Sequence, residues 1–370
     1  MIRSGIHLAE TDEEKEAVYR FRYEIYVTEM GRLSQVADHD TKRLIEPQDA
    51  TARIFYAAVD GDVVATSRFS WGGDAPFSER MIALYNLAPF LAELPPEAIA
   101  VGERGMVKPA LRGSPIFTEL GQFSVKFVQE NRIQLIFGLC EPHLLSRYVS
   151  QGVRTYAKQN VCSADAGYFI PIVTVVEDVE YFRRIGSPTA ETAKDWGDDA
   201  RIPACVDRLI TNGGNVMSQR LIASADYLQE VQGALGDLAE HQLSALDGLS
   251  EDAAGRALGK SNIIECLAGD RVLKKGSVAR NMFVVLEGTL EVRDDSGNLI
   301  RVMSPGDIFG EMAFLLEQPR SAHVDAATNC RVLSLSEGTI RESITADPEV
   351  AAQLLLNVSK ILCKRVLERG

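Results

Sequence analysis

The sequence predicts an α+β protein with two domains joined by a helical connector, and three observations support this. The pattern of residues 8–185 predicts an antiparallel meander that passes into a strand, loop, helix, strand and helix. The pattern of residues 265–335 predicts short strands interrupted by Gly and Asp, as in a small antiparallel jelly roll. Apolar residues recur at helical spacing over 202–258. We therefore expect a first domain over 1–190, a helical connector over 191–245 and a second domain over 246–370.

The first domain is expected to begin with a helix capped by Thr11, with a Glu three residues later. Two strands, joined by the tight turn Asp60-Gly61-Asp62, follow that helix. The later elements in order are a strand near 98–107, a helix over 118–131, a strand over 135–140 and a helix over 143–151. A mixed sheet with helices is the structure that this order predicts.

The second domain is expected to be built from alternating strands separated by glycine turns. The strands are predicted at 271–274, 282–286, 289–292, 299–302 and 330–335. Asp347-Pro348-Glu349 then begins a helix with apolar residues at three- and four-residue spacing up to Val366. The connector between the domains either packs inside the chain or forms the seam of a homodimer, and its apolar spacing does not distinguish the two.

One loop of the second domain carries a carboxylate and a guanidinium close together. It reads Phe309-Gly310-Glu311-Met312-Ala313, and Arg320-Ser321-Ala322 follows shortly after it. A carboxylate can accept a ribose hydroxyl, and a guanidinium can bind a phosphate through two parallel hydrogen bonds. Glycine lets main-chain N–H groups approach the phosphate closely. The loop therefore suits a ribose phosphate, whereas an isolated Glu and Arg in a turn would be ordinary surface residues.

Residues 240–369, with this loop and glycine spacing, resemble the cyclic-nucleotide-binding domain family. The resemblance implies that Glu311 binds the ribose hydroxyl and Arg320 binds the phosphate of cyclic AMP or cyclic GMP. It also implies that the phosphate cradle is completed by Ser321, Phe309 and the main chain at Gly310, Met312, Ala313 and Ala322. In the family, the helix after the barrel covers the base. No helix-turn-helix follows here, so we do not expect DNA binding.

Composition narrows the classes of function. Lys and Arg number 39 against 52 Asp and Glu, giving a net charge of −13, which disfavours nucleic acid as a partner. The six cysteines show no C-x-x-C motif, so neither a metal site nor a disulfide framework is expected. No apolar run reaches the length of a membrane span, and the amino terminus lacks the apolar core of a signal peptide. We expect a cytoplasmic protein with no membrane span.

The first domain resembles the GNAT acyltransferase superfamily. Arg22-Tyr23, Tyr26, Glu29-Met30-Gly31, the hairpin and Arg104-Gly105-Met106-Val107 are similar to the branch of acyl-homoserine lactone synthases and N-acyl amino acid synthases. The resemblance implies an acyl donor bound by Val107 and by the loop residues Arg112, Gly113 and Ser114 at a helix start. Pro115 and Phe117 stand where the superfamily has small residues. This departure favours a pantetheine arm carried by an acyl carrier protein over acyl-CoA.

The net positive charge of this region suits an acidic acyl carrier protein as the acyl donor. Residues 101–160 hold eight Lys and Arg against four Asp and Glu, a basic island in an acidic chain. Acyl carrier proteins are acidic, so this island could steer one to the donor site. The alternative is that these Lys and Arg side chains are ordinary solvent-exposed residues on the outer faces of helices.

Amide formation needs a base for the acceptor amine and an acid for the leaving thiolate. Glu103 is the candidate base, because it shares a strand face with position 101, where the synthases carry their glutamate. The alternative is a structural ion pair from Glu103 to Arg68 or Arg104. Tyr148 is the candidate acid, and a packed aromatic is the alternative. Arg32 replaces the tryptophan of the lactone synthases, which disfavours S-adenosylmethionine as acceptor.

Two classes of function follow from the sequence. The first is a cyclic-nucleotide-regulated N-acyltransferase acting on a small, amino-acid-like amine, with a protein lysine acetyltransferase using acetyl-CoA as the alternative enzyme. The second is a cyclic-nucleotide-responsive binding protein whose first domain is not catalytic.

Overall fold

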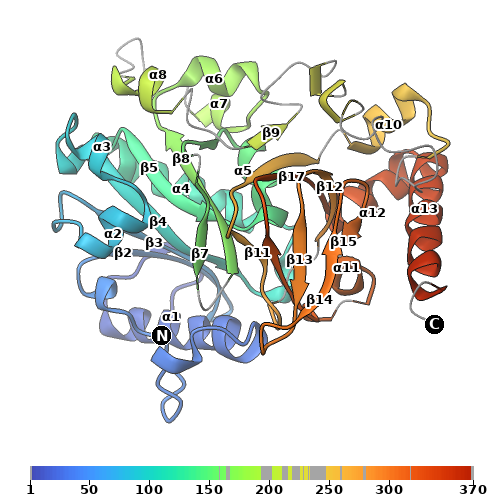
Figure 1. The fold of residues 1–370 in the computed structure, drawn as a ribbon. Helices are drawn as coiled ribbons and strands as arrows, with labels where there is room; N and C mark the ends of the chain where they lie inside the picture. The colour runs from blue at the N-terminus through green and yellow to red at the C-terminus, as the bar shows by residue number, and fades with distance from the viewer. Residues whose placement is uncertain are drawn as a thin grey trace. The chain divides into compact units, whose positions relative to one another are not determined.

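The computed structural model describes residues 2–157, 159–163, 167–192, 202–210, 216–218, 226–227, 229–231, 233, 247–258, 261–277, 281–316 and 318–367. The chain forms two compact units (Figure 1). The first comprises Met1–Leu139, Gly152–Tyr156 and Pro171–Asn212, and the second comprises Cys140–Gln151, Ala157–Ile170 and Gly213–Gly370. The predicted boundary near residue 190 therefore differs from the one observed, because two segments inside the expected first domain pack with the second unit.

A mixed sheet forms the centre of the first unit. Its strand order is β1-β2-β3-β4-β5-β8-β6. The bounds are β1 Gly5–Leu8, β2 Arg53–Val59, β3 Asp62–Trp71, β4 Ile99–Val107, β5 Leu135–Cys140, β6 Arg154–Thr155 and β8 Gly167–Val175. Strands β1 to β4 are antiparallel neighbours, and β4 pairs in parallel with β5. A short strand, β7 (Val161–Ser163), pairs with the start of β8 in the second unit.

Helices cover both faces of this sheet. Helix α1 (Asp12–Arg22) begins with the predicted capping box, in which Thr11 and Glu14 each accept a main-chain hydrogen bond from the other. It packs with Ile54, Tyr56 and Ala58 of β2, and α4 (Ile116–Glu130) packs on the opposite face with Phe55 and Ala57. Both faces of β2 are thus buried. The remaining helices are α2 Glu79–Leu84, α3 Ala88–Leu91, α6 Val179–Arg184, α7 Thr189–Thr192 and α8 Cys205–Leu209.

Two antiparallel sheets form the jelly roll of the second unit. One has the order β15-β12-β17-β10-β9 and the other the order β11-β16-β13-β14. The first sheet comprises β9 Val216–Ser218, β10 Asn262–Cys266, β12 Asn281–Glu287, β15 Ile308–Phe309 and β17 Cys330–Ser336. The second comprises β11 Arg271–Leu273, β13 Leu290–Arg293, β14 Leu299–Met303 and β16 His323–Ala326. The five strands predicted here are confirmed to within two residues at each end.

Helices pack against the first of these sheets. They are α5 Leu145–Ser150, α10 Glu251–Leu258, α11 Glu311–Leu316, α12 Glu337–Ala346 and α13 Pro348–Leu367. Leu333 and Leu335 of β17 pack with Leu354, Val358 and Ile361 of α13. The predicted carboxyl-terminal helix is confirmed as α13. Among the described residues, no helix has the length and apolar character that a membrane span requires.

The described part of the connector follows the helical prediction except at one short strand. Helix α8 and the described residues 226–227, 229–231 and 233 are helical. Val216–Ser218 is instead a strand, β9, which pairs with β10. Hydrogen bonding to a sheet edge outweighs the local helical pattern there. The rest of the predicted connector lies largely outside the described residues.

Candidate functional site

The loop after β15 has the geometry of a phosphate cradle. Gly310 has a φ of +78°, a left-handed conformation that favours glycine. A Cβ atom at this position would lie 2.6 Å from Nη1 of Arg320 and 3.2 Å from the main-chain oxygen of Asn281. Position 310 therefore requires glycine both for its backbone conformation and for the space that the guanidinium occupies.

Arg320 is 3% exposed and lies beneath this loop. Its Nη1 donates to the Gly310 oxygen at 2.6 Å, and its Nη2 donates to O and Oδ1 of Asn281 at 2.7 and 2.6 Å. Its buried Nε has no hydrogen-bond partner within the described part of the chain. Burial lowers the pKa of Arg320 to about 10, while the charges of Glu311 and Glu141 act to raise it. Arg320 is therefore a buried cation at neutral pH with a donor to spare for an anion.

The other predicted cradle residues lie on the same two chain segments as Gly310 and Arg320. Glu311 begins α11, the short helix that also carries exposed Met312 and buried Ala313. Ser321 is exposed, and its hydroxyl donates to the sulfur of Met312 at 3.8 Å. Phe309 stacks on Phe283 with ring centroids 4.9 Å apart. Figure 1 shows α11 beside β12, β14 and β15. Ala322 follows Ser321 and is half-buried.

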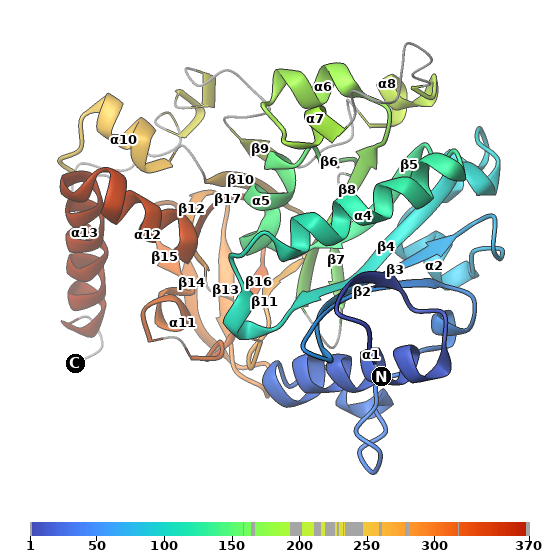
Figure 2. The same cartoon turned by 180° about the vertical axis from the view of Figure 1, so that it is seen from behind.

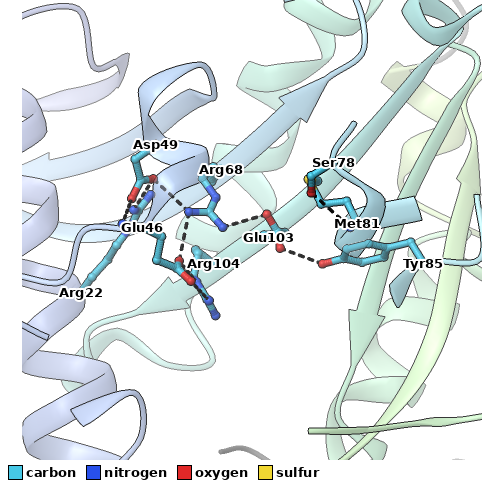
Figure 3. Close-up of polar contacts among 9 residues, drawn as sticks. All are labelled: Arg22, Glu46, Asp49, Arg68, Ser78, Met81, Tyr85, Glu103 and Arg104. Carbon is cyan, nitrogen blue, oxygen red and sulfur yellow. Dashed lines mark hydrogen bonds and ion pairs between the residues drawn. The ribbon is translucent and has the colours of Figure 1, made fainter. Parts of the chain in front are cut away.

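A buried cluster of charges lies in the first unit (Figure 3). Its centre is Arg68, which is fully buried and pairs with Glu46, Asp49 and Glu103 at 3.0, 3.0 and 2.8 Å. Arg22, also fully buried, pairs with Asp49 at 2.7 Å.

Arg104 completes the cluster. It pairs with Glu46 through two nitrogens, and its guanidinium lies 5.1 Å from the ring centre of Tyr26. The cluster thus contains three arginines and three carboxylates, so that its charges balance.

The charges within the cluster shift the pKa values of its members. Burial acts to raise the pKa of Glu46, but its hydrogen bond from Arg104 and the charges of Arg104, Arg68 and Arg22 outweigh this and lower it to about 2. Burial and the neighbouring Glu103 raise the pKa of Tyr85 well above its usual value. Glu46 is therefore ionised, and Tyr85 carries its proton, throughout the neutral range.

Glu103 is held by two donors from different elements. Its Oε2 accepts from Nη2 of Arg68 at 2.8 Å, and its Oε1 accepts from the hydroxyl of Tyr85 at 2.9 Å. The register of β4 against β3 is regular from Ala100 to Glu103, so residues 101 and 103 share a face. Arg104 then has a φ of +54°, at an irregularity in the pairing. The ion pair with Arg68, which the sequence offered as the alternative for Glu103, is present.

The predicted donor-loop residues lie together between β4 and α4. Arg112 donates to both carboxylate oxygens of Glu29, at 2.6 and 2.8 Å, and to the main-chain oxygen of Val107 at 3.2 Å. Gly113 has a φ of +88°, and Ser114 accepts from the main-chain N–H of Ile116 at 3.5 Å.

The candidate acid, Tyr148, belongs to the second unit, where it is half-buried on α5.

Several residues of these sites were not predicted from the sequence. Asn281, which accepts from Arg320, and Glu46, Asp49 and Tyr85 of the charge cluster are separated from their partners by up to 58 residues in the chain. Asn281 is the polar first residue of the apolar strand β12, whereas Glu46, Asp49 and Tyr85 lie in short helical turns where no local pattern indicates a shared site. Within the described residues, no group of His, Cys, Asp and Glu could hold a metal ion.

Comparison with known proteins defines the class of the second unit. Residues 263–347 match the family described as the cyclic nucleotide-binding domain. This segment, with its glycine-dependent loop and buried arginine, is a cyclic nucleotide-binding domain.

Individual relatives are similar over a limited length. Glutaminase 2 of Bradyrhizobium diazoefficiens is 35% identical over 100 residues, covering 27% of this chain and 16% of that protein. The CRP-like cAMP-activated global transcriptional regulator of Mycobacterium tuberculosis is 26% identical over 102 residues, covering 26% of this chain and 44% of that protein. The solved cyclic nucleotide-binding domain from Methylobacillus flagellatus KT is 18% identical, with a TM-score of 0.36, and covers 42% of this chain and 85% of that chain. The chain thus spans less than half the length of these two curated relatives.

Proposed function

We propose that the protein is an N-acyltransferase regulated by a cyclic nucleotide. In this proposal the first unit moves an acyl group from a carrier-protein or coenzyme A thioester to the amine of a small, amino-acid-like acceptor. The cyclic nucleotide-binding domain senses cyclic AMP or cyclic GMP. The observation that carries the catalytic part is the arrangement of β4, its following loop, α4 and β5.

Strands β4 and β5 pair along only a short length. Residues 99–101 pair with residues 135–137, whereas β4 continues to Val107. Beyond residue 101, β4 has pairing to β3 on one side but no described pairing to β5 on the other. A pantetheine arm contains amide groups, which can form hydrogen bonds with such a strand edge. This edge leads to the loop with Arg112 and Gly113, where the proposal places the donor.

Glu103 lies on the same strand, at the start of the unpaired stretch. An acceptor amine is protonated at neutral pH, so it needs a nearby carboxylate and then a route for its proton. In the proposal Glu103 holds the ammonium group and takes up its proton. Arg68 and Tyr85 fix the direction of its carboxylate, and residual lone pairs on both oxygens remain available.

The exposed positive charge of Arg112 supports an acidic carrier protein as the acyl donor. Arg112 is exposed and lies beside Gly113, so an acidic carrier protein can approach this loop. The existing pair with Glu29 is solvent-exposed and therefore worth about 1 kcal/mol or less, so a phosphate or acidic group can replace it.

The regulatory ligand is proposed to be cyclic AMP. The relative from Mycobacterium tuberculosis is named as cAMP-activated, and the cradle around Arg320 suits the cyclic phosphate of either nucleotide. Ser321 does not favour one base over the other.

The test is an assay of thiol release by the purified full chain. Acyl carrier protein and coenzyme A thioesters of several chain lengths are supplied with a panel of amino acids, with and without cyclic AMP. Mass spectrometry of lipids from overproducing cells would identify the N-acylated product. Acetylation of protein lysines would support the acetyltransferase alternative. Nucleotide binding without any thiol release would support the non-catalytic binding protein.

A further inference from the structure

A row of buried polar side chains crosses the first sheet of the second unit. It consists of Asn281 on β12, Ser334 on β17 and Asn262 on β10, and all three are 3% exposed or less. The neighbouring residues in each strand, such as Met282, Leu333 and Ile263, belong to the apolar core. Side chains alternate between faces along a strand, so the polar row occupies the face opposite this core.

One end of the row contacts the phosphate-binding arginine. Nη2 of Arg320 donates to Oδ1 of Asn281 at 2.6 Å, and Nδ2 of Asn281 donates to the hydroxyl oxygen of Ser334 at 3.2 Å. Ser334 lies directly opposite Asn262 in the pairing of β10 with β17. Side chains that face each other in an antiparallel pair lie about 5 Å apart. The side chains of Ser334 and Asn262 are therefore close neighbours, and the row has no gap between them.

The other end of the row contacts helix α5. Nδ2 of Asn262 donates to the hydroxyl oxygen of Ser146 at 2.6 Å. The turn before α5, Pro142–Leu144, packs against β17 (Figure 2). All of these residues belong to the second unit, which takes in Cys140–Gln151 as well as the nucleotide-binding domain.

Helix α5 is also linked by the chain to the proposed catalytic unit. It begins five residues after Cys140, the last residue of β5, and it carries the candidate acid Tyr148. A change in the position of α5 would therefore act on the end of β5 and on Tyr148 together.

We infer that the row of Asn281, Ser334 and Asn262 couples Arg320 to α5, so that binding of a cyclic nucleotide repositions segment 140–151. This inference rests on the proposed function, because it requires the phosphate to bind Arg320. Asn262 and Ser146 are positioning residues that act through their neighbours.

The physical reason is that the phosphate and Asn281 share one rigid guanidinium. Three of its five N–H donors go to Gly310 and Asn281. A cyclic phosphate takes two parallel hydrogen bonds from a guanidinium and so fixes the orientation of its plane, and the hydrogen bonds to Asn281 shift with that plane. A buried amide left without a partner is costly, and the row rearranges to satisfy it. The charge of Glu141 also acts on Arg320, and an incoming phosphate opposes that attraction.

The test is hydrogen–deuterium exchange of the full chain, followed in peptides that span residues 140–151. Cyclic AMP is added at saturation, as established by calorimetry for each variant. We expect the nucleotide to change exchange in this segment at least about twofold in the wild-type chain. Ser146→Ala is expected to bind cyclic AMP but to lose this change.

Ser150→Ala is the matched control, because its hydroxyl on the same helix donates only to Arg147 of α5 in the described contacts. It is expected to respond like the wild type. A wild-type response in Ser146→Ala, or no response at 140–151 in a nucleotide-bound wild type, would overturn the inference. Absence of nucleotide binding in the wild type would instead refute the proposed sensor, and absence of thiol release with an intact exchange response would refute only the proposed catalysis.

Discussion

Gly310→Ala tests the geometry of the phosphate cradle. The backbone at position 310 has a φ of +78°, which costs a residue with a Cβ atom about 1–2 kcal/mol. The added carbon would lie 2.6 Å from Nη1 of Arg320. Non-bonded heavy atoms keep about 3.5 Å or more between them, so the guanidinium must retreat by about 1 Å.

That retreat should weaken phosphate binding strongly. A charge-assisted hydrogen bond contributes about 1.5–3 kcal/mol, so losing one good phosphate contact lowers affinity by about tenfold to a hundredfold. Calorimetry with cyclic AMP measures this directly. Gly297→Ala is the control, because Gly297 has a similar φ of +81° but open space around its Cβ position. Equal affinity in the two variants would refute the cradle assignment.

Three further predictions concern single carboxylates. Glu103→Gln should lower turnover by about a hundredfold while donor binding persists, and an unchanged rate of thiol release would exclude it as the base. Glu311→Ala should weaken cyclic AMP binding by about tenfold, measured by calorimetry, and unchanged affinity would remove Glu311 from the ribose contact. Glu46 has its pKa lowered from 4.5 to about 2, so its ionised form stabilises the folded state above pH 4.5, and this contribution disappears as the pH falls to about 2. The unfolding free energies of the wild type and Glu46→Gln should therefore differ by up to about 3 kcal/mol at neutral pH and converge in acid, and a difference that is independent of pH would contradict this.

Local sequence signals predicted most of the secondary structure. The capping box at Thr11, the turn at Asp60-Gly61 and the glycine turns of the second unit each depend on neighbouring residues, and each is present in the structure. The loop with Gly310 and Arg320 was predictable for the same reason. Its two charged residues, Glu311 and Arg320, lie nine positions apart on one short segment.

The parts that could not be predicted depend on contacts between distant segments. Strand β9 forms because β10 offers a free edge, which a reading of residues 216–218 alone does not show. Arg68 gathers carboxylates from positions 46, 49 and 103, and no spacing in the sequence signals such a cluster. The contacts that α5 makes within the second unit likewise include Asn262, more than a hundred residues later in the chain.

The central claim is that a cyclic nucleotide controls acyl transfer by the same chain. The most direct measurement is the initial rate of thiol release from an acyl-carrier-protein or acyl-CoA thioester, with an amino acid acceptor, at zero and at saturating cyclic AMP. The account predicts measurable release that changes at least severalfold with the nucleotide, and a reciprocal change of nucleotide affinity when the donor is bound. Release that is absent, or that proceeds at the same rate with and without cyclic AMP, would contradict it.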